Sequence, residues 1–237
     1  MQYLNRKKIY EKQPPAKDAK KIYIFCEGAV REVNYFRYFE GLSSNIEILP
    51  IPCENDHSDP TKLMENAKRL FLGTEKLPAT YSLSIDFKDE IWFVIDTDTW
   101  QEQGKISTLK NFCSTLHNDV NGWTVAQSNP CFEIWLLYHF TDQKPKQNEV
   151  DVCDSFKDYV GKKIAGGVDV RKAPLYLPAA INNSLTNFET DNGFPVLYTT
   201  AIHELGNVIL PFISEQLQKA EKMIAAQKAA SQKVSQV

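Results

Sequence analysis

The sequence predicts an α/β fold in which a largely parallel sheet is flanked by helices and followed by a helical C-terminal elaboration. Two observations favour this class. Short β-branched and aromatic runs bounded by polar residues are typical of buried strands, and the stretches between them carry apolar residues at helical spacing. The clearest such runs are residues 22–26 and 91–95. Strands that alternate with helices form βαβ units, which predict a parallel sheet.

The first half of the chain supplies three predicted strands and two predicted helices. A strand over residues 21–26 leads through Glu27 and Gly28 into a helix over residues 31–42. The elements expected next are a strand at 46–51, a helix at 60–72 and a strand at 91–95. The helix at 60–72 opens with Asp59 and Pro60, and proline suits a first helical position because its missing N–H would have no partner there.

The second half begins with a predicted helix at 104–117 and a fourth strand at 123–126. The intensely apolar segment 128–140 is predicted to be a buried helix that opens just after this strand. Further helical stretches are expected at 150–163, 173–185 and 199–226. Pro211 is predicted to break or kink the last of these helices, and the Ala-, Gln-, Lys- and Ser-rich end is predicted to be frayed or disordered.

The composition is that of a globular protein. A chain of 237 residues, 43% hydrophobic and 24% charged, suits one large domain or a domain with an appendage. Its longest apolar stretch, near residues 134–140, is too short to span a bilayer, and its N-terminus has no apolar signal-peptide core. We therefore expect a cytoplasmic protein without a membrane partner. The five cysteines lack paired short spacings, which favours buried thiols over a zinc site or disulfides.

The charge is distributed unevenly along the chain. The net charge of −3 argues weakly against a nucleic-acid partner, but residues 1–21 carry seven Lys and Arg against Glu11 and Asp18, or about +5. The remainder then carries about −8 (−3 minus +5). A basic arm on an acidic body is either a phosphate-seeking extension or a solvated tail, and the second case is the commoner one.

Acidic residues follow two of the predicted strands. Glu27 ends the first apolar run, and Asp96 and Asp98 end the run at 91–95. Parallel strands bring their carboxyl ends to one edge of a sheet, where open α/β folds bind ligands, so these three carboxylates are expected to share a crevice. Crowded carboxylates raise one another's pKa unless a cation neutralises them, and hard divalent cations prefer oxygen ligands. The sequence therefore predicts that Glu27, Asp96 and Asp98 bind Mg²⁺ or Mn²⁺.

Each acid also has a simpler interpretation. Glu27 could cap the helix that follows it, Asp98 could cap a helix after a loop-entry turn, and Glu32 could be an ordinary first-turn acid favoured by the helix dipole. An isolated Asp-x-Asp pair favours the turn. The combination with Glu27 reverses that preference.

Four further side chains are candidates for the same site. Glu133 lies at the start of the apolar segment 128–140, where an acid is costly to bury unless it is paired or bound to metal, so it is predicted to act in catalysis. Arg31, His139 and Lys163 are candidates for contacts to a substrate phosphate. A satisfied core histidine is the commoner interpretation of His139, and most such basic residues are simply solvated.

Several familiar chemistries have no support in the sequence, which lacks the phosphate loop, the serine nucleophile elbow, the zinc-protease helix and the dinucleotide fingerprint. Glu27-Gly28 and the later Asp96-x-Asp98, each after a strand, resemble instead the Toprim arrangement of topoisomerases, primases and overcoming-lysogenization-defect nucleases. More specifically, the chain resembles the RloB-like family. The segments that carry this resemblance are Phe25-Cys26-Glu27-Gly28 with Glu32 and Tyr35-Phe36, Asp89-Glu90-Ile91-Trp92 through Asp98, Ser128 to Phe140, and Pro195 with Thr199 and His203-Glu204-Leu205.

The resemblance spans about residues 21–210, and the segment 128–140 is its most specific part. One departure stands out. Similar proteins usually continue Cys-Glu-Gly with Glu-Lys-Thr before the second Glu, whereas Ala29, Val30 and Arg31 stand here. A lysine near the site is therefore missing, and Arg31 is a possible replacement.

The resemblance implies a function and a division of the chain. It implies metal-dependent cleavage of a DNA or RNA phosphodiester, at a site of Glu27, Asp96, Asp98 and Glu133, in a protein of restriction-modification or abortive-infection loci that acts in phage defence. The alternative is a non-catalytic binding or regulatory module that acts with an ATPase encoded nearby. The predicted parts are a basic flexible arm at 1–20, a Toprim-like domain at 21–141, a helical elaboration at 142–226 and a disordered tail at 227–237.

Overall fold

A five-stranded sheet organises the protein. The computed structural model describes residues 12–53, 59–118, 122–164, 167, 169–170 and 173–234, with side chains described up to residue 226. The strand order is β2-β1-β3-β4-β7, with the first four strands parallel and β7 antiparallel to β4. The strands of this sheet are β1 (Lys20–Cys26), β2 (Ile46–Ile51), β3 (Glu90–Asp96), β4 (Gly122–Asn129) and β7 (Thr199–Thr200). The predicted fold class, α/β with a largely parallel sheet, is confirmed.

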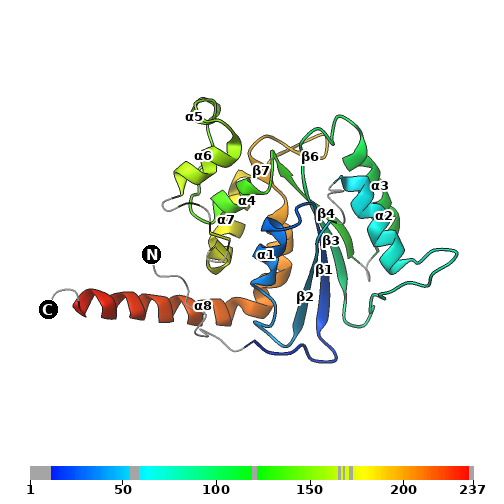
Figure 1. Ribbon diagram of the computed structural model, residues 1–237, viewed down its shortest axis with the longest axis horizontal. Coiled ribbons are helices and arrows are strands. Elements are labelled where there is room, and N and C mark those ends of the chain that lie inside the picture. The colour runs from blue at the N-terminus through cyan, green and yellow to red at the C-terminus, as the bar shows by residue number, and fades with distance from the viewer. Residues whose placement is uncertain are drawn as a thin grey trace.

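Helices cover both faces of the sheet (Figure 1). The helices are α1 (Arg31–Arg37), α2 (Pro60–Phe71), α3 (Lys105–Leu116), α4 (Glu133–Tyr138), α5 (Gln147–Val150), α6 (Phe156–Lys163), the 3₁₀ helix η1 (Ala173–Tyr176), α7 (Leu177–Asn187) and α8 (Ile202–Val234). A short hairpin of β5 (Thr190–Asp191) and β6 (Phe194–Pro195) lies between α7 and β7.

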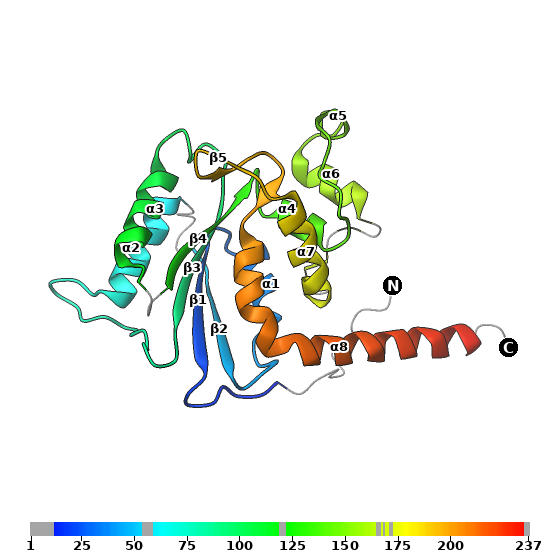
Figure 2. The same cartoon turned by 180° about the vertical axis from the view of Figure 1, so that it is seen from behind.

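The alternation of side chains along β1 explains the two layers. Ile22 and Ile24 point to one face and join a core with α1, α4, α7 and α8. Tyr23 and Phe25 point to the other face and pack with α2 and α3. Figure 2 shows the same arrangement from behind, with α2 and α3 on one side of the sheet and α1 and α8 on the other. Strands buried on both faces need continuous apolar runs, which is the pattern that the sequence displays.

The order of the strands places a switch point between β1 and β3. From β1 the chain passes through α1 to β2 on one side, and from β2 it returns through α2 to β3 on the other side of β1. Crossovers on opposite faces leave a crevice beyond the carboxyl ends of the two central strands, where ligands of open α/β sheets bind. The residues that follow these two strand ends are Glu27 and those after Asp96.

The segment 128–140 differs from the single buried helix that the sequence predicted. Strand β4 continues through Asn129, a cis peptide bond joins Asn129 to Pro130, and α4 begins only at Glu133. The strand continues because Ser128 and Asn129 pair with β7, a two-residue strand far away in the sequence that local patterns did not reveal.

The C-terminal elaboration packs mainly through α7 and α8, and α7 lies against α4. Helix α8 runs from Ile202 to Val234 with Pro211 inside it, so the proline does not end the helix. Its backbone remains helical past residue 226, where a disordered tail was predicted. Its first part is anchored in the core, and the Ala, Gln and Lys residues that follow have high helix propensity. Figure 1 shows its far end extending beyond the body of the protein.

The predicted basic arm lies partly outside the described residues, which begin at residue 12. Residues 12–19 form no helix or strand, yet the backbone N–H groups of Gln13 and Ala16 donate to the carbonyls of Gly41 and Ser44 at 2.8 Å each. This part of the arm is therefore tethered to the loop after α1. In the described part of the chain, no helix has the length and apolar character needed to cross a bilayer.

Candidate functional site

Glu27 is a buried acid at the end of β1. Its Oε2 accepts a hydrogen bond from the backbone N–H of Asp96 at 2.7 Å, and its Oε1 accepts one from the indole N–H of Trp100 at 2.8 Å. The side chain therefore joins β1 to the segment after β3 and does not cap α1, which begins after Val30 without a side-chain cap. Burial raises the pKa of Glu27 to about 7, with a smaller contribution from the charge of Asp98, although the two hydrogen bonds act in the opposite direction.

Asp96 is the second acid of the site and ends β3. Its Oδ1 accepts the backbone N–H of Phe132 at 2.8 Å, which ties the strand end to the turn before α4. Burial raises the pKa of Asp96 well above its usual value, and the charges of Glu27, Glu32 and Asp98 raise it further. Like charges at close range oppose one another's ionisation, so the site resists holding all of its negative charge at once.

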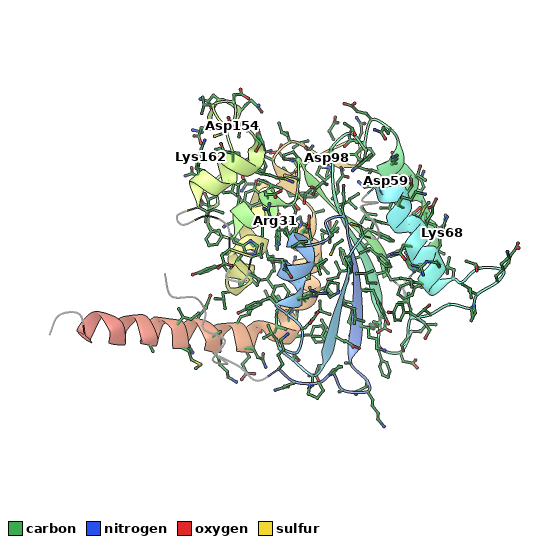
Figure 3. The ribbon with its side chains drawn as sticks, in the orientation of Figure 1. Arg31, Asp59, Lys68, Asp98, Asp154 and Lys162 are labelled. Carbon is green, nitrogen blue, oxygen red and sulfur yellow. The ribbon has the colours of Figure 1, made fainter. Side chains whose placement is uncertain are left out.

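Asp98 is exposed and lies in a turn, with a left-handed φ of 33°. The strand ends at Asp96, so the two aspartates do not lie on one face of an extended strand. Asp98 does not cap helix α3, whose N-cap is Gly104. Its charge nevertheless acts on both Glu27 and Asp96, and Figure 3 shows it at the same end of the sheet as Arg31.

Glu32 is a fourth carboxylate in this group. A Cβ atom placed on Gly28 would lie 1.9 Å from its Oε2, so the carboxyl group lies directly over the Gly28 backbone. Only glycine leaves room for it there. Burial raises the pKa of Glu32, whereas Arg31 and Lys157 lower it. Glu32 is therefore more than an ordinary first-turn acid, because its charge also reaches Glu27 and Asp96.

These carboxylates have the chemistry that a hard divalent cation requires, but their present arrangement is not a finished coordination site. Among the residues that the structure describes, no group of three or more His, Cys, Asp or Glu side chains is positioned to hold one metal ion. Both oxygens of Glu27 face N–H donors, and one oxygen of Asp96 does so too. Asp96 and Asp98 offer the free oxygens, with Glu27 and Glu32 beside them.

Glu133 is buried at the start of α4 and is neutralised by two cations. Its Oε1 forms an ion pair with the guanidinium of Arg31 and lies 3.9 Å from Nζ of Lys157. The cost of burying this acid is thus met by charge pairing, the alternative that its apolar setting left open. Arg31 comes from the start of α1 and Lys157 from α6. The C-terminal elaboration therefore contributes a side chain beside the acids of the sheet.

His139 belongs to the core. Its Nε2 lies 3.0 Å from the Tyr35 hydroxyl and its Nδ1 lies 2.9 Å from the carbonyl of Trp135. Burial lowers the pKa of His139 to about 3, so the ring is neutral. With both ring nitrogens engaged inside the protein, the structure does not bring His139 to the acidic group, and the predicted phosphate contact is not available to it in this arrangement.

Lys163 also lies away from the acidic group, at the last position of α6. Its Nζ pairs with Glu149 at 2.7 Å and sits 5.4 Å from the centre of the Tyr159 ring. It lines a pocket with Lys144 and Lys146. Six residues of helix separate it from Lys157, or about 9 Å along the axis. Two further basic residues of this region, Arg171 and Lys172, lie outside the described residues.

Three contributors to the site were missed from the sequence. Trp100 orients Glu27, Lys157 pairs with Glu133, and Lys105 lies 4.4 Å over the Trp100 ring while pairing with Asp59 at 3.3 Å. Trp100 lies two residues after Asp98, so its position in the sequence was a signal that could have assigned it to the site. Nothing local distinguishes Lys157 from the other lysines of its segment.

Comparison with known proteins identifies the family. The model of the RloB-like protein family matches residues 22–206, well over half of the chain. The chain therefore belongs to the RloB-like family, as its motifs indicated. Neither the curated proteins nor the solved structures contain a match.

Proposed function

We propose that the protein is a metal-dependent nuclease that cleaves phosphodiester bonds of DNA or RNA and acts in defence against phage. The observation that carries the proposal is the crowding of Glu27, Asp96 and Asp98 at the switch point of the sheet. Two of these acids have raised pKa values that a bound cation would reverse. The chain belongs to the RloB-like family, and its resemblance to Toprim nucleases implies the same reaction class.

The residues divide the work according to their environments. Asp96 and Asp98 would hold Mg²⁺ or Mn²⁺, and when bound such an ion polarises the phosphoryl oxygen and activates water. Glu27, whose Oε2 accepts the Asp96 backbone N–H at 2.7 Å, would act as a further metal ligand or as the general base or acid. Trp100 and the Asp96 N–H fix its orientation. Glu133 orients the side chains of Arg31 and Lys157 at the rim of the site.

A cleavage assay tests the proposal. End-labelled single- and double-stranded DNA and RNA are incubated with Mg²⁺ or Mn²⁺ and resolved on gels. Wild type is expected to cut at least one of them, and Asp96→Asn to cut it at least about 100-fold more slowly, the scale for loss of a metal-dependent step. Asp86→Asn, at an exposed acid in the loop before β3, is the matched control and should retain full activity.

The second candidate is a non-catalytic module that keeps this fold and acts with a partner ATPase. It is favoured by the engagement of both Glu27 oxygens and by the lack of an assembled three-ligand arrangement among the described residues. Under this alternative, wild type and Asp96→Asn would be equally inactive on all four substrates, and neither would bind Mn²⁺.

A further inference from the structure

The ion pairs of Glu133 bring together two cations from distant parts of the chain. Arg31 opens α1, directly after the turn that carries Glu27, and Lys157 is the second residue of α6. Both approach the same oxygen of Glu133. The Glu133 side chain is 5% exposed, whereas Arg31 is 48% and Lys157 is 61% exposed. The anion is therefore inside the protein and its two partners present their charged groups to solvent.

The position of Lys157 is fixed by packing. Tyr159 and Val160 of α6, with Ile164 directly after it, join a buried cluster with Ile134 and Leu137 of α4. The helix begins at a defined residue because the Ser155 hydroxyl accepts the backbone N–H of Asp158 at 3.1 Å. Lys157 is thus held at the edge of α6 that faces the start of α4, where Glu133 lies.

The two cations also act on the acidic group. The charges of Arg31 and Lys157 both lower the pKa of Glu32 and of Cys131. The charges of Asp96 and Asp98 act on Cys131 in the opposite direction and raise its pKa. Arg31 and Lys157 share the buried carboxylate of Glu133, and both side chains are exposed to solvent at this rim. If a substrate phosphate is bound to Asp96 and Asp98 through a metal ion, its other oxygens would face the charged groups of Arg31 and Lys157.

We propose that Arg31 and Lys157, held in place by Glu133, form a phosphate clamp that binds the backbone of the nucleic-acid substrate beside the carboxylate group. This clamp rests on the proposed function for its substrate class and extends it by assigning substrate binding to the C-terminal elaboration. It also assigns Glu133 as a positioning residue. Because the contacts are to phosphate, the clamp contributes affinity and not base specificity.

Binding without cleavage tests the clamp. Fluorescence anisotropy follows a labelled single-stranded oligonucleotide, as DNA and as RNA, in EDTA and again with Ca²⁺, at several salt concentrations. Lys157→Met and Arg31→Met are each expected to weaken binding about 5- to 10-fold and to lower the salt dependence by about one phosphate contact. Lys157→Arg keeps the charge and should restore binding to within about twofold of wild type.

Lys162→Met is the matched control. Lys162 is on the same helix, is 60% exposed and pairs with Asp158 of its own helix, but it does not contact Glu133. Figure 3 shows it on α6. Equal affinities for the Lys157→Met and Lys162→Met proteins would overturn the clamp and leave the nuclease proposal standing. If Lys157→Met binds the oligonucleotide more weakly but wild type cleaves none of the substrates, the result would support the clamp and count against the nuclease proposal. A wild-type protein that binds neither oligonucleotide would overturn both.

Discussion

The paired strands β1 and β3 have acids at both ends of the pair, Asp89 and Glu90 at the amino end of β3 and Glu27 and Asp96 at the carboxyl ends, and the environments of these acids differ. At the amino end, Asp89 is buried, and its two oxygens accept the backbone N–H groups of Lys21 and Ser84, each at 2.8 Å. The neighbouring Glu90 pairs with Lys20. Both of these acids have a donor or a cation beside them. These acids join β1, β3 and the preceding loop, which is a structural task.

At the carboxyl end, the acids face other acids. Glu27 accepts two hydrogen bonds, yet its pKa is still raised to about 7, and Asp96 is affected by three neighbouring carboxylates. A protein that needed only stability would not gather these charges, because burying unpaired charge is costly. The comparison teaches that burial of an acid alone does not indicate function. An acid whose charge the fold leaves uncompensated is the stronger signal.

The largest expected effect lies at the amino end. Replacing Asp89 with Ala leaves the N–H groups of Lys21 and Ser84 without their acceptor, which should lower the free energy of unfolding by about 4 kcal/mol, at about 2 kcal/mol for each lost partner. Urea denaturation of the Asp89→Ala and Asp96→Ala proteins measures the difference. The comparison fails if, measured at pH 8 in EDTA, Asp96→Ala lowers the free energy of unfolding as much as Asp89→Ala does.

The second effect is a pH dependence at the carboxyl end. Because the folded pKa of Glu27 is raised from 4.5 to about 7, its protonated form stabilises the fold. That stability is fully present below pH 4.5 and is lost as the pH rises through 7, by about 3 kcal/mol at 1.36 kcal/mol per pKa unit.

The Glu27→Gln variant isolates the pH-dependent contribution of Glu27 to the free energy of unfolding, since the Gln side chain does not titrate. The variant loses one hydrogen bond at every pH, so it should be the less stable protein at pH 4.5 and should gain on wild type as the pH approaches 8. Denaturation in EDTA at several pH values gives the difference in unfolding free energy. A difference that stays constant from pH 4.5 to 8 would show that Glu27 titrates normally.

The smallest effect on stability is expected at Gly28. The Gly28→Ala methyl group would collide with the Glu32 carboxyl, which lies at the end of a flexible side chain and can turn away. We expect the unfolding free energy to change by no more than about 1 kcal/mol, because only one side chain moves. Affinity for Mn²⁺ should fall about 10-fold as a carboxylate leaves the group. In Gly161→Ala, the added methyl has open space, and Mn²⁺ affinity should not change. Equal affinities in the two variants would remove Glu32 from the site.

The sequence was sufficient to predict the strands and the acids that end them. The runs at 22–26 and 91–95 form β1 and β3, and their neighbouring acids Glu27 and Asp96 meet as expected. This succeeded because parallel pairing brings strand ends together whatever the details of the loops. The burial of Glu133 in ion pairs and the core environment of His139 were both among the alternatives that the sequence left open.

The remaining features depend on contacts between distant residues. Strand β7 has two residues and exists only because β4 offers it a partner. Lys157 resembles its neighbours until α6 packs against α4 and turns it toward Glu133. The left-handed turn at Asp98 follows the end of pairing between β3 and β4, at Asp96 and Ser128. Periodicity reports which face of an element is buried, but it does not report what the exposed ends of that element will meet.

The central claim is that the uncompensated acids at the carboxyl end bind a divalent cation. Calorimetric titration of Mn²⁺ near pH 7 into wild type and into Asp96→Asn, repeated in two buffers of different ionisation enthalpy, tests it directly. Wild type should give a saturable heat that depends on the buffer, because an arriving cation displaces the proton that Glu27, with a pKa of about 7, partly holds at this pH. Asp96→Asn should give no saturable heat. Equal binding by both proteins, or none by wild type, would contradict the account.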